Sequence, residues 1–188
     1  AREENNMTPE ISLEEGQALY KAAMNKAYHD LAQKGVQSPN CPMTTGPGGA
    51  WVPYRGEIPP DLTQLKDDQL GTYMGLLTEW GSYIGYQMAE ADVNLDNAKA
   101  NLKLVDAKLG IVYQKGEEDK KRTIPEKEAM VNADRRYIEA QSEVLYWQTM
   151  YTLLRTIYNN AESSYAAISR RVTQRGQEVD RMNRTGQA

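Results

Sequence analysis

The chain has 188 residues, with 22 Lys and Arg against 26 Asp and Glu, so its formal net charge is −4. This acidic balance argues against a protein whose whole field attracts nucleic acid, although it is compatible with a local basic patch. A single cysteine excludes an internal disulfide and fits a reducing compartment. No apolar run approaches the ~20 residues of a membrane span, so we expect a soluble, intracellular protein without membrane contact.

The first predicted element is a short helix from Leu13 to about Lys34. Ser12 and Glu15 form a capping box at its start, and Gly35 is a natural stop. Its apolar side chains recur on one face, and such a stripe on a short helix has to dock on another helix or on a neighbouring subunit. We assign residues 1–35 to this N-terminal helical segment.

Residues 36–62 form a Pro/Gly-rich segment that cannot be a long helix or a central strand. It also carries Trp51, Val52, Tyr54 and Ile58, which are too apolar for a purely flexible tether. We predict an extended arm whose aromatic side chains pack against a helix of its own chain or of the next chain. Trp80, on the following helix, is the candidate contact for this arm. A free linker is the alternative.

Residues 63–188 carry two long apolar repeats, from Leu70 to Val112 and from Met130 to Met182. Apolar side chains recur at alternating steps of three and four, and only Gly81 and Arg175 interrupt the repeats. An average period of 3.5 is typical of a left-handed coiled-coil seam. Two long helices joined by a short polar break normally fold back on each other. The predicted fold is therefore all-α, with a long antiparallel helical hairpin.

Local signals refine the two long helices. Glycines four apart on the first helix share one face and predict close helix–helix approach; they are Gly71, Gly75, Gly81 and Gly85. The second helix restarts at a capping box formed by Thr123 and Glu126, with Pro125 in its first turn. Gly176 marks the start of its fraying end.

The length of the seam predicts self-association, because a two-helix hairpin alone buries little apolar surface. Tyrosines on a seam also retain a hydroxyl that needs a partner, which favours wet or inter-subunit contacts. Trp147 and Tyr151 can alternatively stack on bases, but their seam positions favour packing. The predicted oligomer-interface residues are Tyr137, Val144, Trp147, Tyr151, Leu154, Tyr158 and Tyr165.

No catalytic or metal-binding pattern is present in the sequence. His29 is the only histidine, so neither an H-E-x-x-H pair nor a Cys/His ligand set can form. The glycines at 46–49 are not followed by G-K-[ST] and do not form a phosphate loop. We expect no enzyme, no metal and no cofactor.

Basic residues gather at the predicted tip of the hairpin, where they can contact phosphates locally. The alternative is an ordinary solvated turn, because Glu117, Glu118 and Asp119 neutralise the tip. Arg135 and Arg136 follow in the second helix. A further arginine cluster occurs near the C-terminus, at Arg170, Arg171, Arg175, Arg181 and Arg184.

Three features occur in an order that resembles the UvsY family of phage recombination mediators. Lysines are scattered over 102–113, a charged break covers 115–122, and Asn-Ala-Asp-Arg-Arg at 132–136 is followed by the Tyr146–Trp147 pair. In that family a lysine-bearing helix leads into a polar loop, and an Ala-Asp-basic helix start and a Tyr-Trp pair follow at comparable spacing. The resemblance covers roughly residues 65–171. The chain differs in its acidic balance, its sixty-odd additional N-terminal residues and its longer second helix.

The resemblance implies an oligomeric, non-enzymatic protein of the host-cell cytoplasm that binds single-stranded DNA and helps to load a recombinase. The DNA-binding positions that it carries over are Lys108, Lys115, Lys120, Lys121 and Arg122. The alternative is a structural coiled-coil component of a phage virion or similar assembly. In that case the arm would hold a neighbouring subunit, and the basic residues would contact other virion proteins.

Overall fold

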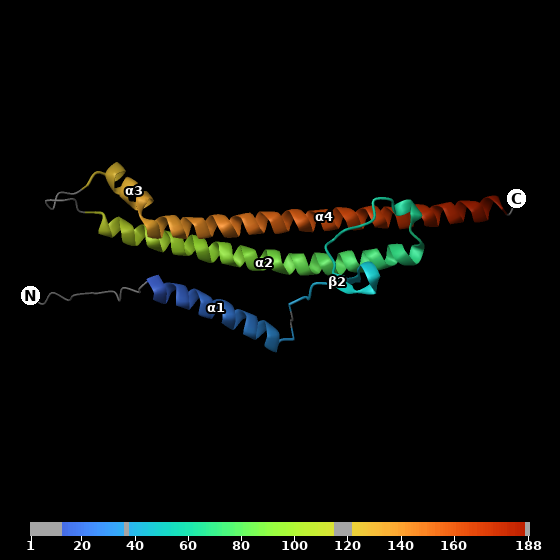
Figure 1. Ribbon diagram of the computed structural model, residues 1–188, viewed down its shortest axis with the longest axis horizontal. Coiled ribbons are helices and arrows are strands. Elements are labelled where there is room, and N and C mark those ends of the chain that lie inside the picture. Colours follow the sequence, from blue (N-terminus) through green and yellow to red (C-terminus); the bar gives the residue numbers. More distant parts are fainter. Residues whose placement is uncertain (1–12, 36–37, 115–121, 187–188) are drawn as a thin grey trace, which may run out of the picture. The chain divides into compact units, whose positions relative to one another are not determined.

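The computed structural model describes residues 13–35, 38–114 and 122–186, and the predicted cap Ser12 lies outside them. The protein is mostly helical, in agreement with the predicted class (Figure 1). The strand β1 (Met43–Thr45) is followed by a one-turn 3-10 helix, η1 (Pro47–Gly49). The strand β2 (Trp51–Pro53) comes next and is followed by a second 3-10 helix, η2 (Leu62–Gln64). The α-helices are α1 (Leu13–Gln33), α2 (Asp67–Val112), α3 (Ile124–Ala133) and α4 (Arg135–Thr185).

The chain divides into two compact units. Unit 1 comprises Ala1–Gln37 and Ala91–Thr149, and unit 2 comprises Ser38–Glu90 and Met150–Ala188. The helices α2 and α4 each contribute one segment to each unit, and each unit has a core of its own. The linear division at residues 35 and 62 stays a prediction.

The core of unit 2 forms where a segment of α2 packs against a segment of α4. The two segments run antiparallel: the Arg175 guanidinium bonds to the Asp67 carboxylate, and one edge of the Tyr158 ring faces Gly85. Within each helix the buried side chains are seven residues apart, which keeps them on one face. The buried core residues are Leu70 and Leu77 from α2, Ala161 and Ile168 from α4, and Tyr54 from the arm.

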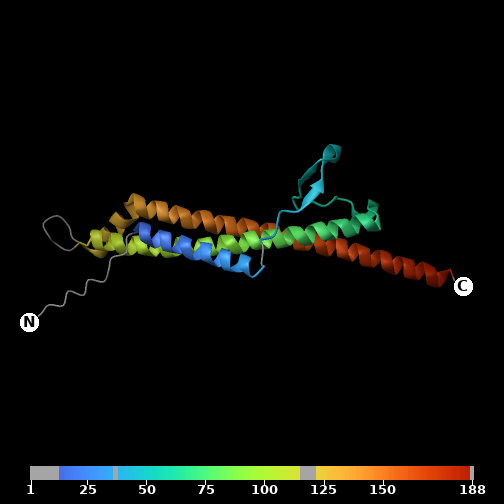
Figure 2. The same cartoon turned by 90° about the horizontal axis from the view of Figure 1, so that it is seen from below.

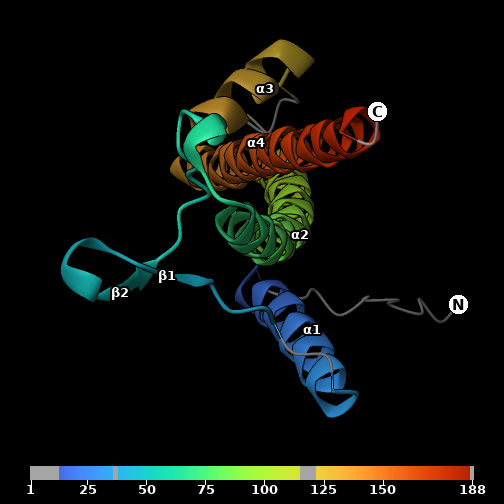
Figure 3. The same cartoon turned by 90° about the vertical axis from the view of Figure 1, so that its right-hand side faces the viewer.

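The arm of unit 2 forms a β-hairpin, which the all-α prediction did not include. The two strands pair antiparallel, with Thr44 opposite Val52. Gly48 and Gly49 have φ of 75° and 82°, in the left-handed region that glycine occupies at low cost, so the chain can reverse within a short turn. The hairpin projects from the unit in two perpendicular views (Figures 2 and 3).

The base of the hairpin is packed against α2. Tyr54 is buried, its hydroxyl donates to the Glu57 carbonyl oxygen (2.9 Å), and its ring meets Trp80 edge-on at 6.1 Å between centroids. Gly56 has φ of 76° and lies so close under Trp80 that an added Cβ would be 2.6 Å from the indole nitrogen. The arm therefore packs against a helix of its own chain through Tyr54, and the predicted contact of Trp80 with the arm is confirmed. The predicted packing is wrong for Trp51, which is exposed.

Unit 1 has a second core, and it includes a helix break that differs from the prediction. The buried residues are Val105 and Leu109 of α2, Val131 of α3 and Ala140 of α4. A single helix from Thr123 onward was expected, but Asp134 adopts an extended backbone conformation (φ −72°, ψ 132°) between α3 and α4. The expected seam is therefore wrong at its start, where Met130 is 40% exposed and the neighbouring Val131 is buried.

The other helix ends follow local signals more closely. At the start of α3 the Thr123 backbone N–H and hydroxyl both donate to the Glu126 carboxylate, at 2.9 and 2.8 Å, so this part of the predicted capping interaction is confirmed. Gly35, with φ of 78°, follows α1 as predicted. By contrast, α4 continues to Thr185, well beyond the expected fraying point at Gly176.

Candidate functional site

Two of the five predicted DNA-binding residues, Lys108 and Arg122, are described by the structure, and they flank the connection between α2 and α3. The Arg122 backbone N–H donates to the Gln114 carbonyl oxygen (3.3 Å), which brings the two ends of this connection together. Lys108, in the penultimate turn of α2, and Arg122 are half-buried. The remaining candidates, Lys115, Lys120 and Lys121, lie outside the described residues.

A hollow of about 550 Å³ opens beside this connection in unit 1. Lys127 lies along one wall, with its Nζ 3.2 Å from the position that a Cβ on Gly110 would occupy. Lys127 was not among the predicted candidates, although its place in the first turn after the charged break was a usable signal. Other residues that line the hollow are Asp106, Ile111, Gln114, Ile124 and Asn132.

The arginines that follow the connection are engaged with neighbouring acids. Arg136 binds the Asp134 carboxylate through Nε (3.0 Å) and Nη2 (2.8 Å), and the Tyr113 hydroxyl donates to the same carboxylate (2.8 Å). These bonds, those from Arg136 first, hold the pKa of the Asp134 carboxyl well below its usual value. Arg135 pairs with Glu139 at 2.6 Å. Arg136 therefore stabilises the α3–α4 junction, whereas Arg135 pairs within α4. Because each has an acidic partner, both arginines are less available to a phosphate than an unpaired side chain would be.

The predicted interface residues on α4 are less buried than their counterparts on α2. Tyr165 is 40% exposed, and the other six (Tyr137, Val144, Trp147, Tyr151, Leu154 and Tyr158) are half-buried. On α2, by contrast, eight seam positions are buried: Leu70, Leu77, Ile84, Ala91, Leu95, Ala98, Val105 and Leu109. The aromatic seam of α4 thus retains surface that a further partner can cover.

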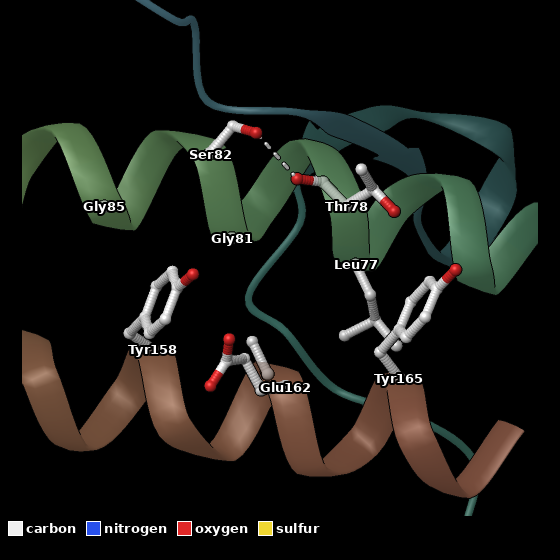
Figure 4. Close-up of a pocket in the computed structure, with 9 residues that line it drawn as sticks. Leu77, Thr78, Gly81, Ser82, Gly85, Tyr158, Glu162 and Tyr165 are labelled. Carbon is white, nitrogen blue, oxygen red and sulfur yellow. Dashed lines mark hydrogen bonds between the residues drawn. The ribbon is translucent and has the colours of Figure 1, made fainter. Parts of the chain in front are cut away.

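Two of these tyrosines line a hollow of about 580 Å³ within unit 2 (Figure 4). Tyr158 and Tyr165 stand on α4 with Glu162 between them, opposite Gly81 and Gly85 of α2. A Cβ added to Gly85 would lie 3.6 Å from the Tyr158 ring. A Cβ added to Gly81 would have no atom within 4 Å. The structure therefore shows an open groove at Gly81 where the glycine spacing predicted close helix packing.

Exposed apolar side chains also occur on α4 outside the seam. In unit 1 they are Ile138, Leu145 and Tyr146, and in unit 2 they are Leu153 and Ile157. The heptad repeat gives no signal for them, because none occupies a seam position. They are additional candidates for protein contact.

Within residues 13–35, 38–114 and 122–186, no three His, Cys, Asp or Glu side chains gather in a way that could hold a metal ion. The Gln33 side-chain amide N–H donates to His29 Nε2 at 2.9 Å on the exposed surface of α1. Among the helices that the structure describes, none is both long and apolar enough for a membrane span.

Comparison of the chain with protein-family models, with curated proteins and with solved structures gave no significant match.

Proposed function

We propose that the protein is a non-enzymatic, self-associating accessory protein that binds single-stranded DNA and helps to load a recombinase. The observation that carries this proposal is the hydrogen bond between Arg122 and Gln114 (3.3 Å), which joins the ends of the lysine-bearing connection. It supports the proposal because it joins Gln114 and Arg122, the two described residues between which Lys115, Lys120 and Lys121 lie in the sequence, and Lys108 precedes them in the penultimate turn of α2.

Local basic charge can act in an acidic protein because phosphate contacts are short-ranged at physiological salt, where the screening length is about 8 Å. Each Lys or Arg that neutralises a phosphate releases a condensed counterion. Four such contacts to a single strand correspond to a slope of about −3 in log K against log salt concentration. Because Arg135 and Arg136 are paired with acids, the proposal assigns the DNA contact to the connection.

Self-association is the second part of the proposal. We infer that α2 and α4 form a long antiparallel hairpin and that copies of it meet as a coiled coil along the aromatic seam of α4. The half-buried Tyr151 and Tyr158 and the exposed Tyr165 support this inference, because their remaining surface would be covered by a neighbouring copy. An oligomer would present several basic connections to one strand and so raise the overall affinity.

The test is the binding of a fluorescently labelled thymidine oligonucleotide, followed by anisotropy from low to physiological salt. The wild type should bind at low salt and weaken steeply as salt rises. Replacing Lys115, Lys120, Lys121 and Arg122 with Ala should weaken binding and flatten the salt dependence.

The matched control replaces Lys21, Lys26, Arg181 and Arg184, four exposed basic residues in other parts of the chain, with Ala. Both variants lose the same formal charge, so an equal loss of affinity would assign binding to net charge alone. Absence of binding by the wild type at low salt would overturn the proposal.

The second candidate function is a structural component of a virion or similar assembly. It is favoured by the exposed apolar side chains of α4, among which Leu145 is 65% exposed. Mass spectrometry of purified particles tests it, because a structural component is abundant in the particle. Enrichment in particles without any oligonucleotide binding would favour this candidate.

A further inference from the structure

The β-hairpin of unit 2 presents a tryptophan to solvent. Trp51 is the first residue of β2 and is 71% exposed, whereas Tyr54, three residues later, is buried. A large apolar side chain held out in water gains nothing from burial within the chain, so it is a candidate for intermolecular contact.

The hairpin that carries Trp51 is fixed at its base. The Tyr54 backbone N–H donates to the Pro42 carbonyl oxygen (2.8 Å), which extends the strand ladder by one step, and Trp80 covers Gly56. Trp51 is therefore attached to a rigid element, and little conformational freedom is lost when it binds a partner.

The segment that begins with β2 carries an exposed aromatic side chain, Trp51, and an exposed cationic side chain, Arg55. Exposure alternates along residues 51–55, where Trp51, Pro53 and Arg55 are exposed, Val52 is half-buried and Tyr54 is buried, although Arg55 lies two residues beyond the end of β2. At about 3.3 Å per residue, an extended backbone would separate the Cα atoms of Trp51 and Arg55 by about 13 Å. In the part of the chain that the structure describes, Arg55 forms no ion pair. The exposed face thus offers an aromatic ring and a cation without an ion pair to any described residue, within reach of a few nucleotides.

We propose that this face of the hairpin binds single-stranded DNA, with Trp51 stacking on a base and Arg55 contacting a phosphate. Aromatic stacking and a nearby cation are the two elements with which proteins bind single strands without sequence preference. The inference rests on the proposed function and adds to it a second contact, on a segment of the chain that lies outside the resemblance to recombination mediators.

The test uses the full-length protein, the labelled thymidine oligonucleotide and two variants of one residue, Trp51→Phe and Trp51→Ala. Loss of one stacked base should weaken binding about tenfold in Trp51→Ala and less in Trp51→Phe. The slope of log K against log salt should not change, because stacking releases no counterions. Arg55→Gln should reduce that slope by about one contact, or roughly 0.7.

Tryptophan emission gives an independent reading. The oligonucleotide should quench the emission of the wild type, and an abasic strand of the same length should not. The quenching should disappear in Trp51→Phe, whose remaining tryptophans, Trp80 and Trp147, are half-buried. Met182→Ala, a replacement of another exposed apolar residue (70%), is the matched control and should bind as the wild type does.

The outcomes separate this inference from the proposed function. If the Lys/Arg variant of the connection loses binding but Trp51→Ala does not, the stacking contact is wrong and the proposed function stands. If the wild type binds no oligonucleotide, both fail. If Trp51→Ala changes the mass measured by light scattering and leaves DNA affinity unaltered, the face is a protein contact and the inference is overturned.

Discussion

Arg175 of α4 donates from Nη1 to the Asp67 carboxylate at 2.7 Å, although the two residues are 108 positions apart in the chain. Its Nη2 also donates to the Thr63 carbonyl oxygen (3.0 Å), so one guanidinium joins α4 to both the first residue of α2 and the turn before it. Arg175 interrupts the apolar repeat of α4, and this contact gives the interruption a structural role.

The first prediction concerns the stability that Arg175 provides. Arg175→Ala should lower the free energy of unfolding by about 1 kcal/mol, a value reduced from that of a fully buried charged hydrogen bond because the Asp67 side chain is exposed. Urea unfolding followed by circular dichroism measures it. Arg181→Ala removes the same charge from an exposed position and should change stability by less than about 0.5 kcal/mol. Equal effects of the two replacements would contradict the assigned role.

The second prediction concerns the packing of Trp80 over Gly56. Gly56→Ala should destabilise unit 2 by about 2–4 kcal/mol, because an unfavourable positive φ is combined with a clash against the indole. Gly49→Ala also places Ala at a positive φ, but with no atom within 4 Å, so it should cost only about 1 kcal/mol. Urea unfolding followed by tryptophan emission compares the two. Similar losses would show that Trp80 moves aside freely.

The sequence allowed the helical class and much of the α2 core to be predicted. Burial on a helix follows its own periodicity, so the spacing of Leu70, Leu77 and Ile84 was sufficient to place them on one buried face. The start of α3 was predictable for a similar reason, because Thr123 and Glu126 interact within a single turn. The long helical hairpin of α2 and α4 depends on contacts between distant segments, and the coiled coil depends on contacts between copies. Both stay predictions.

The features that sequence reasoning missed depend on contacts between residues distant in the chain. Asp134 can cap a helix or lie inside one, and its bond to the Tyr113 hydroxyl, 21 residues away, favours the break between α3 and α4. The arm that carries the β-hairpin similarly contacts a distant residue, because Trp80 of α2 packs over Gly56. Trp51 of the arm was expected to pack on a helix, but Tyr54 is the arm residue that is buried against α2, and Trp51 is exposed.

The third prediction concerns the Tyr54 hydroxyl. Burial raises its pKa to about 12, so the folded protein keeps the proton between pH 10 and 12 while the unfolded chain releases it. The contribution of the Tyr54 hydroxyl to the free energy of unfolding is therefore fully present below pH 10 and is lost as the pH rises toward 12. At pH 7 Tyr54→Phe should cost about 1 kcal/mol through the lost bond to the Glu57 carbonyl. The loss of stability in Tyr54→Phe relative to the wild type should shrink above pH 10, which urea unfolding at pH 7 and above pH 10 measures. A loss that does not change with pH would show that the hydroxyl ionises in the folded state.

The fourth prediction concerns the acid stability of the α3–α4 junction. Because Arg136 and Tyr113 depress the pKa of Asp134 in the folded state, the stabilisation is present above the unfolded value near 4 and is lost as the pH falls below it. Asp134→Asn should therefore lower the melting temperature at pH 7 and make it less sensitive to pH between 5 and 2.

Glu126→Gln, at the opposite end of α3, removes a second carboxylate whose pKa is lowered by bonds to Thr123. It should independently make the melting temperature less sensitive to pH over the same range. Because the two sites share no hydrogen-bond partner, their effects should add in the double variant. An unchanged acid response in Asp134→Asn would mean that the bonds to Arg136 and Tyr113 do not persist in solution.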